Sequence, residues 1–410
     1  MSQGKFDDHF SARIRGVNAS TIREICRLAG MKDFISLAGG WPNPDTFPYD
    51  FTRKAIGKLM KARVGDVLQY GMSEGLLPLR QWFQGWLKER EGIEADIDEI
   101  IITAGSQMAM DLTCRVLVDR GDVCLVDLPT YIGGSGSIQF YGGELVGVPT
   151  DNQGTCVDAM EKMLAGLRRE GRKVKLFYLL SLNHNPLGVT MSESRKRKLM
   201  RLADEYNFLL MEDNPYSDLF YKGKRRLPAK AMDENGRIVY IKSFAKIFSP
   251  GIRMAVVVGH RDIIGKMTIA RQFVDCCPSN LNQYLLYEFC SSGMIDKHIR
   301  KIRRFYAARR KQMLGLIEKY FPAEVRTTNP SGGLFVFVYL PEKINAADVL
   351  QEVIALKVVF VTGSQFYVDG SGANTFRMSF AQVREDRMEE AISKIGKVLH
   401  GKLRQPRKPG

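Results

Sequence analysis

A series of short apolar segments between Glu99 and Gly259 constrains the fold more than any other feature of this sequence. Helix-length segments separate them, and each apolar segment has the length of a strand. Strands that are apolar along their whole length are typical of a parallel sheet covered by helices on both faces. The sequence therefore predicts an α/β fold with a mostly parallel central sheet, whose strands are Ile100–Ala104, Val123–Leu128, Val174–Leu180, Phe208–Glu212, Ile238–Ile241 and Met254–Gly259.

The length of the chain predicts more than one domain. Its 410 residues exceed what one compact core usually holds. We expect an N-terminal segment over residues 1–48, a large domain over residues 49–285 built on the parallel sheet, and a small domain over residues 286–410. In this last part, predicted helices and strands follow each other in a way typical of an α+β arrangement.

Basic residues outnumber acidic residues. Sixty Lys and Arg against forty-five Asp and Glu give a formal net charge of +15, which suits an anionic cofactor or an acidic substrate. No zinc-finger spacing or RNA-binding aromatic signature accompanies this charge, so we do not expect nucleic acid as a partner. The arginines from Arg300 to Arg310 are predicted to form a solvated or interface face of a long helix that runs from Met294 to about Ile317.

The cysteines and the N-terminus indicate the compartment. The seven cysteines form no C-x-x-C pair and are odd in number, so we expect neither a disulfide framework nor a metal site. Reduced thiols are typical of intracellular proteins. The N-terminus lacks the apolar stretch of a signal peptide, and no run of about twenty apolar residues is present to span a membrane. We therefore expect a cytoplasmic protein with no membrane partner.

Polar or glycine-rich residues follow the predicted strands, at the edge where parallel sheets bind ligands. Two of them open a predicted helix, whose free amide groups attract an anion. Each residue taken alone also has a simpler interpretation, as a helix cap, a turn former before proline or a half-buried aromatic. The residues concerned are Ser106, Gln107, Tyr131, Asn185, Asp213 and Tyr216.

The segment Ile241–Arg253 carries the most reactive combination of side chains. It places a hydroxyl at Ser243, an amine at Lys246 and a guanidinium at Arg253 in a short loop after a strand. Ser and Arg bind phosphate well, and a lysine between them is suited to form a Schiff base with a carbonyl group. Taken alone, the segment is also compatible with an ordinary basic loop.

Together these strand ends meet the requirements of pyridoxal phosphate, a pyridine ring that carries a phosphate, a hydroxyl and an aldehyde. Asp213 would pair with the protonated ring nitrogen and so let the ring accept electrons. Asn185 and Tyr216 would hydrogen-bond the ring hydroxyl, Tyr131 would lie against the ring face, and Lys246 would meet the aldehyde. The sequence therefore predicts this cofactor.

Arg377 and a glycine pair extend the predicted site. Arg377 sits within an apolar strand, where it needs an anionic partner, either an internal carboxylate or the carboxylate of a substrate. Gly39 and Gly40 end another strand and let backbone approach a ligand closely, although a simple turn would explain them as well.

These motifs resemble those of the fold-type I pyridoxal-phosphate aminotransferases of classes I and II. The resemblance covers nearly the whole chain, and Ile35-Ser-Leu-Ala-Gly-Gly40 with Ser20-Thr-Ile-Arg-Glu24 is most similar to the subgroup of α-aminoadipate and kynurenine aminotransferases. The other motifs that carry it are Gln69-Tyr-Gly71, Asn185-Pro-Leu-Gly188, Asp213-Asn-Pro-Tyr216, Ser243-Phe-Ala-Lys246, Pro250-Gly-Ile-Arg253 and Arg377.

The resemblance implies roles for single residues. Lys246 would be the Schiff-base lysine and the base that moves a proton, and Arg377 would bind the substrate α-carboxylate. Ser106, Gln107, Ser243 and Arg253 resemble ligands of the cofactor phosphate. The family also implies a homodimer with shared active sites, in which Tyr70 reaches the phosphate of the partner subunit, and a predicted helix over Asn18–Ala29 that covers the substrate with Ser20 and Arg23.

The sequence departs from the family pattern at four positions. Leu187 replaces a usual threonine, Ala245 replaces a serine, Thr362 stands where a proline is usual, and Trp41 is bulkier than the usual apolar residue. None removes a predicted cofactor ligand, but they leave the amino donor open.

The expected function is transfer of an amino group from an L-amino acid to a 2-oxo acid, with 2-oxoglutarate as the family's usual acceptor. Another reaction on the same scaffold, β-elimination or decarboxylation, stays open because Lys246 and Asp213 stabilise any carbanion at Cα. A ligand-sensing regulator with this fold is a third hypothesis, which would need a DNA-binding domain ahead of the shared motifs.

Overall fold

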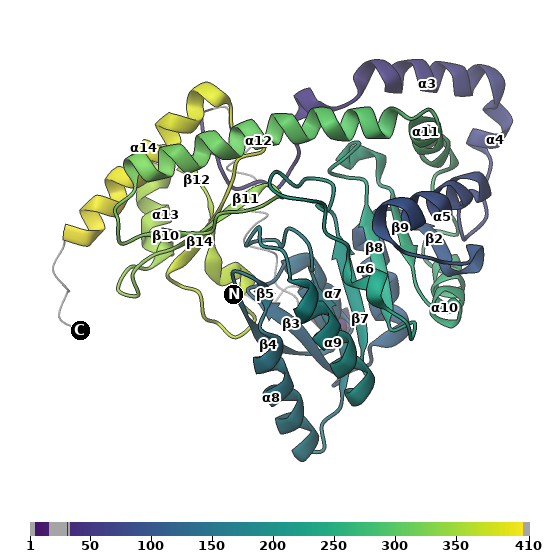
Figure 1. Cartoon of the computed structure of the whole chain (residues 1–410), viewed down its shortest axis with the longest axis horizontal. Helices are drawn as coiled ribbons and strands as arrows, with labels where there is room; N and C mark the ends of the chain where they lie inside the picture. Colours follow the sequence, from purple (N-terminus) through teal and green to yellow (C-terminus); the bar gives the residue numbers. More distant parts are fainter. Residues whose placement is uncertain (1–4, 16–30, 32, 405–410) are drawn as a thin grey trace.

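The computed structural model describes residues 5–15, 31 and 33–404 of the chain. Figure 1 shows a larger part around the central sheet and a smaller, C-terminal part, with the long helix α12 (Met294–Tyr320) extending along both. The predicted helix over Asn18–Ala29, and with it Ser20 and Arg23, lies outside the described residues.

Within the described residues, the central sheet has eight strands in the order β2-β9-β8-β7-β6-β3-β4-β5. Strands β4, β3, β6, β7 and β8 run parallel to one another, so the prediction of an α/β fold with a mostly parallel sheet is confirmed. The strands are β2 (Ile100–Thr103), β3 (Val123–Leu128), β4 (Glu144–Asp151), β5 (Gly154–Thr155), β6 (Val174–Leu179), β7 (Leu209–Asn214), β8 (Ile238–Ser243) and β9 (Ala255–Val258).

Strand β9 was predicted at the right place, but it runs antiparallel to both β2 and β8. The loop between β8 and β9 contains only turns and the 3₁₀ helix Pro250–Ile252, which is too short for the crossover that a parallel strand requires.

Strands β4 and β5 were not predicted. β4 mixes buried and exposed positions, so it lacks the continuous apolar run that identified the others.

Alternate residues of the strands pack into two hydrophobic cores, one on each face of the sheet. Val239 belongs to one core and Tyr240, its neighbour in β8, to the other, as the pleat of a strand requires. The first face is covered by α6 (Ser106–Leu117), α7 (Ile132–Phe140) and α10 (Arg261–Gln272), and the second by α5 (Leu77–Glu91), α8 (Val157–Arg169), α9 (Glu193–Tyr206) and α11 (Asn280–Ser291).

The smaller part contains an antiparallel sheet in the order β10-β11-β14-β13. Its elements are β10 (Arg326–Thr327), β11 (Phe335–Tyr339), α13 (Ala346–Ala355), β12 (Val358–Val359), β13 (Val361–Thr362), β14 (Thr375–Ser379) and α14 (Glu385–Arg404). The N-terminal segment joins this part, because β1 (Ile35–Ser36) pairs with β12. In the part of the chain that the structure describes, the α-helices α1 (Ala12–Arg15), α3 (Tyr49–Ala62) and α4 (Val64–Leu68) precede α5.

Two expectations about the C-terminal part differ from the structure. The expected domain boundary at residue 286 falls inside α11, a single helix that ends at Ser291, so the division of the chain stays a prediction and would fit better at Gly293. The predicted solvated arginine face is wrong for Arg309 and Arg310. Both are buried on α12, where they donate to the carbonyl oxygens of Phe380 and Pro330.

Among the described residues, no helix combines the length and the apolar character needed to cross a membrane. The same residues contain no group of His, Cys, Asp and Glu side chains that is arranged to hold a metal ion.

Candidate active site

A cavity of about 380 Å³ lies at the carboxyl ends of β7 and β8, between the larger part and the sheet of the smaller part. Its walls bring together residues that the sequence placed at separate strand ends. The predicted site residues that line it are Gly39, Gly40, Ser106, Gln107, Tyr131, Asn185, Asp213, Tyr216, Ser243, Lys246, Arg253 and Arg377. Tyr70 is not in the cavity wall, and its side chain is 82% exposed.

Asp213 is the penultimate residue of β7 and is almost completely buried beside the cavity. Its Oδ2 accepts a hydrogen bond of 3.1 Å from the hydroxyl of Tyr178, whereas its Oδ1 has no hydrogen-bond partner among the described residues. Burial raises the pKa of Asp213 to about 7, although Tyr178 and Lys246 act in the opposite direction. A buried carboxylate oxygen with no partner fits a cationic ligand atom, such as the nitrogen of a protonated pyridine ring.

Lys246 lies in the loop after β8 and points into the same cavity. Its Nζ donates a hydrogen bond of 3.0 Å to the carbonyl oxygen of Gly40. Burial lowers the pKa of Lys246 to about 8, and the positive charges of Arg377 and Arg253 add to the effect, while Asp213 opposes it. About a tenth of the amine is therefore neutral at pH 7, far more than for a free lysine, and the neutral form is the one that attacks a carbonyl carbon.

One end of the cavity is suited to a phosphate group. Ser106 opens α6, so the first amide groups of this helix point toward the cavity, as predicted. The guanidinium of Arg253 lies beside them: a Cβ atom added at Gly105 would lie 2.6 Å from its Nη2. Gly105 also has a φ of 83°, which disfavours any other residue there. Ser243, buried at the end of β8, completes this end.

Gln107 contributes differently from the other predicted phosphate ligands. Its side-chain nitrogen donates 2.9 Å to the hydroxyl of Ser137 and 3.3 Å to the carbonyl oxygen of Gly133. The side chain thus binds α7, and what the residue offers at the helix N-terminus is its backbone amide.

Arg377 projects from β14 into the cavity from the smaller part. Its Nη1 donates 2.8 Å to the side-chain oxygen of Asn185, and its Nη2 donates 2.9 Å to the carbonyl oxygen of Ala38. Its guanidinium carbon lies 4.1 Å from the centre of the Phe335 ring and 4.8 Å from that of Phe366. The planar group is therefore fixed in orientation, as bidentate binding of a carboxylate requires.

Two tyrosines supply aromatic surface and a hydroxyl group. The ring of Tyr131 folds over Gly133, where an added Cβ would lie 2.4 Å from the ring. Tyr216 is buried and packs edge to face on Phe335, with ring centres 5.9 Å apart. Burial raises the pKa of both hydroxyl groups, so they stay neutral and able to donate hydrogen bonds.

The glycine pair allows close packing around the cavity. A Cβ at Gly40 would lie 2.8 Å from the tip of the Phe335 ring, and a Cβ at Gly39 would lie 3.4 Å from the ring of Trp41. Trp41 is half exposed and forms part of the cavity wall. Gly39 therefore leaves room for the ring of Trp41 and Gly40 for the ring of Phe335.

Sequence reasoning missed several contributors to the site. Tyr178 lies in the apolar strand β6 and Phe335 and Phe366 in the smaller part, and nothing in their spacing links them to Asp213 or Arg377. Only for Tyr178 did the sequence contain a feature that could have indicated its role. A tyrosine in a buried strand of a sheet needs a hydrogen-bond partner, and a neighbouring strand ends in an acidic residue.

Comparison with known proteins identifies a family. The family model described as aminotransferase class I and II matches residues 33–395 of the chain. An aromatic-amino-acid aminotransferase from Thermococcus litoralis is 38% identical over 400 residues, which cover 98% of this chain and 96% of that protein.

Two solved structures are also similar along their whole length. A kynurenine aminotransferase from Pyrococcus horikoshii in complex with PMP has a TM-score of 0.95 and 38% identity, covering 98% of this chain and 99% of that chain. An α-aminoadipate aminotransferase from Thermus thermophilus, complexed with N-(5'-phosphopyridoxyl)-L-leucine, has a TM-score of 0.89 and 30% identity, covering 97% and 99%.

Proposed function

This chain belongs to the aminotransferase class I and II family, and we propose that it transfers an amino group from an L-amino acid to a 2-oxo acid through a Schiff base at Lys246. The cofactor of such an enzyme is pyridoxal phosphate. The observation that carries the proposal is the convergence of Lys246, Asp213 and Arg377 in one cavity.

The residues of the cavity fit this cofactor. The unpartnered Oδ1 of Asp213 would bind the ring nitrogen, while Asn185 and Tyr216 would bind the ring hydroxyl and Tyr131 would cover the ring face. The phosphate would be held by the start of α6, with Ser106 and Gln107, and by Ser243 and Arg253. When bound, the cofactor supplies an electron sink for the pair of electrons left at the substrate Cα.

Lys246 would move the proton in each half of the reaction. Its neutral amine would take a proton from Cα of the amino acid and hold it at Nζ for return in the same half-reaction. The lowered pKa, about 8, suits a group that must both accept and return a proton near neutral pH. Asp213, held by Tyr178, would be the residue that pairs with a protonated ring nitrogen.

Arg377 would orient the substrate. Its guanidinium is fixed by Asn185, Ala38 and the Phe335 ring, so an incoming α-carboxylate meets donors that are already aligned. Because Arg377 and Lys246 line the same cavity, Cα of a substrate bound by Arg377 would lie near Lys246.

The amino donor is proposed to carry an aromatic side chain, with 2-oxoglutarate as the acceptor. Trp41 supplies an aromatic face at the cavity wall, next to Gly39, and an aromatic substrate would stack on it. The names of the Thermococcus and Pyrococcus relatives, which refer to aromatic amino acids and to kynurenine, support the same class.

The enzyme is further proposed to act as a homodimer. Leu68, Tyr70 and Met72 expose 69%, 82% and 70% of their surface next to a loop that is held by Asn280. A second copy would cover these apolar side chains, and Tyr70 of the partner subunit would reach the phosphate. Analytical sedimentation of the holoenzyme measures its oligomeric state. A monomer at micromolar concentration would contradict the proposed dimer.

A single-turnover experiment tests the reaction class. The holoenzyme is mixed with an aromatic L-amino acid without any 2-oxo acid, and pyridoxamine phosphate and the 2-oxo product of the donor are expected in equal amounts. Release of ammonia with pyruvate, or of carbon dioxide, would instead show elimination or decarboxylation. The Lys246→Ala variant is the control, because it should give neither product set.

A further inference from the structure

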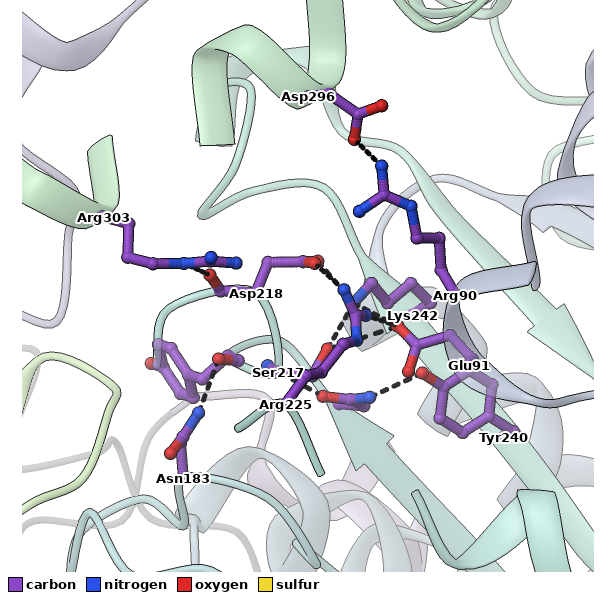
Figure 2. Close-up of polar contacts among 12 residues, drawn as sticks. Arg90, Glu91, Asn183, Ser217, Asp218, Arg225, Tyr240, Lys242, Asp296 and Arg303 are labelled. Atoms are coloured by element: carbon purple, nitrogen blue, oxygen red, sulfur yellow. Dashed lines mark hydrogen bonds and ion pairs between the residues drawn. The ribbon is translucent and has the colours of Figure 1, made fainter. Parts of the chain in front are cut away.

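Behind the active site, on the opposite face of β7 and β8, lies a group of four charged residues that the reaction does not use (Figure 2). We call Glu91, Asp218, Arg225 and Lys242 the buried ion cluster. Glu91, Asp218 and Lys242 are each at most 1% exposed. Burial of a charged side chain destabilises the folded protein unless the charge has a partner of opposite sign. The contacts among the four side chains therefore show how their charges are compensated.

The cluster is balanced in charge and closely connected. Nζ of Lys242 lies 2.9 Å from Glu91 Oε1 and 2.6 Å from Asp218 Oδ2, and it also donates to the hydroxyl of Ser217. Arg225 donates 2.6 Å to the same oxygen of Glu91 and 2.9 Å to Asp218 Oδ1. The lysine ammonium therefore donates hydrogen bonds to Glu91 and Ser217 and forms an ion pair with Asp218.

Two residues of the cluster, Lys242 and Asp218, lie within two positions of a residue of the cavity. Lys242 precedes Ser243, and the pleat of β8 turns the two side chains to opposite faces of the sheet. Ser217 and Asp218 follow Tyr216 directly. Within the same loop, the backbone amide of Ser217 donates 3.1 Å to the side chain of Asn214, the residue after Asp213.

The cluster also connects the larger part with α12. Nε of Arg303 donates 3.1 Å to the carbonyl oxygen of Asp218, and its guanidinium stacks 3.8 Å from the centre of the Phe220 ring. Arg90, next to Glu91, forms an ion pair of 2.5 Å with Asp296 at the start of α12. Figure 2 shows the contact of Arg303 with Asp218 and, separately, the ion pair of Arg90 with Asp296.

We propose that the buried ion cluster is a positioning device for the cofactor site and that Lys242 is its central positioning residue. By holding Ser217 and Asp218, Lys242 fixes the loop that carries Asp213 at one end and Tyr216 within it. Without the ammonium, two carboxylates would share one arginine, and the loop would move to admit water or a counterion. The proposal rests on the proposed function, because Asp213 and Tyr216 are assigned there to the cofactor.

The test compares Lys242→Met with the charge-balanced double variant Lys242→Met/Glu91→Gln. We expect the single variant to weaken pyridoxal phosphate binding roughly tenfold or more, because a small displacement of binding groups has large effects. Its cofactor absorbance should also titrate at a different pH from that of the wild type. Hydrogen exchange of residues 213–218 in the cofactor-free protein should be faster. In the double variant, cofactor affinity, the titration of the cofactor absorbance and the rate of hydrogen exchange should all return close to their wild-type values.

Lys196→Met is the matched control. Lys196 is also fully buried, and its Nζ donates to the carbonyl oxygen of Leu227, outside the cluster. Both single variants should lower the melting temperature, but only Lys242→Met should change cofactor binding and its titration. Equal effects of the two variants on stability, with wild-type cofactor binding and titration in both, would overturn the proposal.

Two further measurements keep the test decisive. If Lys242→Met does not fold, Lys242→Arg retains the charge, but its planar guanidinium cannot reproduce the contacts of the ammonium with Glu91, Ser217 and Asp218. It should shift the titration in the same direction, and an unchanged titration contradicts the proposal. A wild-type protein that never acquires the cofactor absorbance would instead refute the proposed function, so the two failures are distinguishable.

Discussion

Lys242 and Lys246 lie four residues apart, one in β8 and one in the loop after it, yet their surroundings have opposite charge. Lys242 contacts two carboxylates, those of Glu91 and Asp218. Lys246 shares its cavity with Arg377 and Arg253, and burial together with their charges lowers its pKa to about 8. The first lysine is held in place by its partners, and the second is left able to react.

Two aspartates on β7 and its loop show the same contrast. Burial would raise the pKa of Asp218, but Lys242 and Arg225 outweigh it and hold this pKa below the usual range. For Asp213, burial outweighs the hydrogen bond from Tyr178 and the charge of Lys246, and the pKa rises to about 7. Burial alone therefore does not decide whether a carboxyl group stays charged, because the number and charge of its partners do.

The largest effect is expected from Lys246→Ala. Removal of the amine should lower the rate of amino-group transfer by roughly 10⁴-fold or more, because both the covalent step and the proton transfer depend on it. Rapid mixing with the amino acid measures the loss. Lys196→Ala is the control and should retain activity, and a Lys246→Ala variant with more than about a hundredth of wild-type activity would contradict the role.

Asp213→Asn should mainly lower the reaction rate, whereas Asp218→Asn should mainly lower the free energy of unfolding. Asp213→Asn should lower the rate roughly 10²- to 10⁴-fold. Because the folded pKa of Asp213 is raised, the cofactor-free wild type loses stability as pH rises from about 4 to about 7, and the variant should not. Asp218→Asn should instead cost about 3–5 kcal/mol of stability. Melting curves of the cofactor-free proteins on both sides of this pH range measure the difference.

Arg377→Lys should weaken substrate binding without preventing the covalent step. Lysine keeps the positive charge but loses the planar group that Asn185 and Phe335 orient, so KM for amino acids should rise roughly 10- to 100-fold. Cofactor absorbance should stay as in the wild type. Arg310→Lys, in the same part of the molecule but bonded to a backbone carbonyl, is the control, and an equal rise in KM there would argue against a carboxylate site at Arg377.

The pKa of Lys246 can be tested without substrate. Attachment of pyridoxal phosphate to the cofactor-free protein needs the neutral amine, so its rate should rise about tenfold per pH unit up to about 8 and then level off. Stopped-flow absorbance measures this profile. A profile that keeps rising to about pH 10 would mean that the surroundings of Lys246 leave its pKa at that of a free lysine.

The smallest effect is expected from Trp41→Ala. Loss of the aromatic wall should raise KM for aromatic donors several-fold, in keeping with about 1 kcal/mol for one stacking contact, and should hardly change KM for alanine. Trp82→Ala is a control for loss of a tryptophan outside the cavity. An equal change for aromatic and small donors would remove Trp41 from the set of residues that select the substrate.

The sequence predicted the parts of the molecule that local patterns encode. Apolar runs identified the strands of the parallel sheet, and the residues just after them identified Asp213, Ser243 and Lys246 as neighbours, because parallel strands end at a common edge. The same reasoning failed where the apolar pattern was weak, at β4, and where the strand direction depended on loop length, at β9.

Contacts between distant segments were decided by the tertiary structure. The sequence alone did not indicate that Glu91 and Lys242, 151 positions apart, would form an ion pair, or that Arg309 and Arg310 would be buried under the smaller sheet. Spacing along the chain reports which face a side chain takes, but not which element will cover that face. The sequence by itself therefore determined the sheet and the chemical groups at its edge. The charge states of these groups were decided by packing, because they depend on partners that only folding brings within a few ångströms.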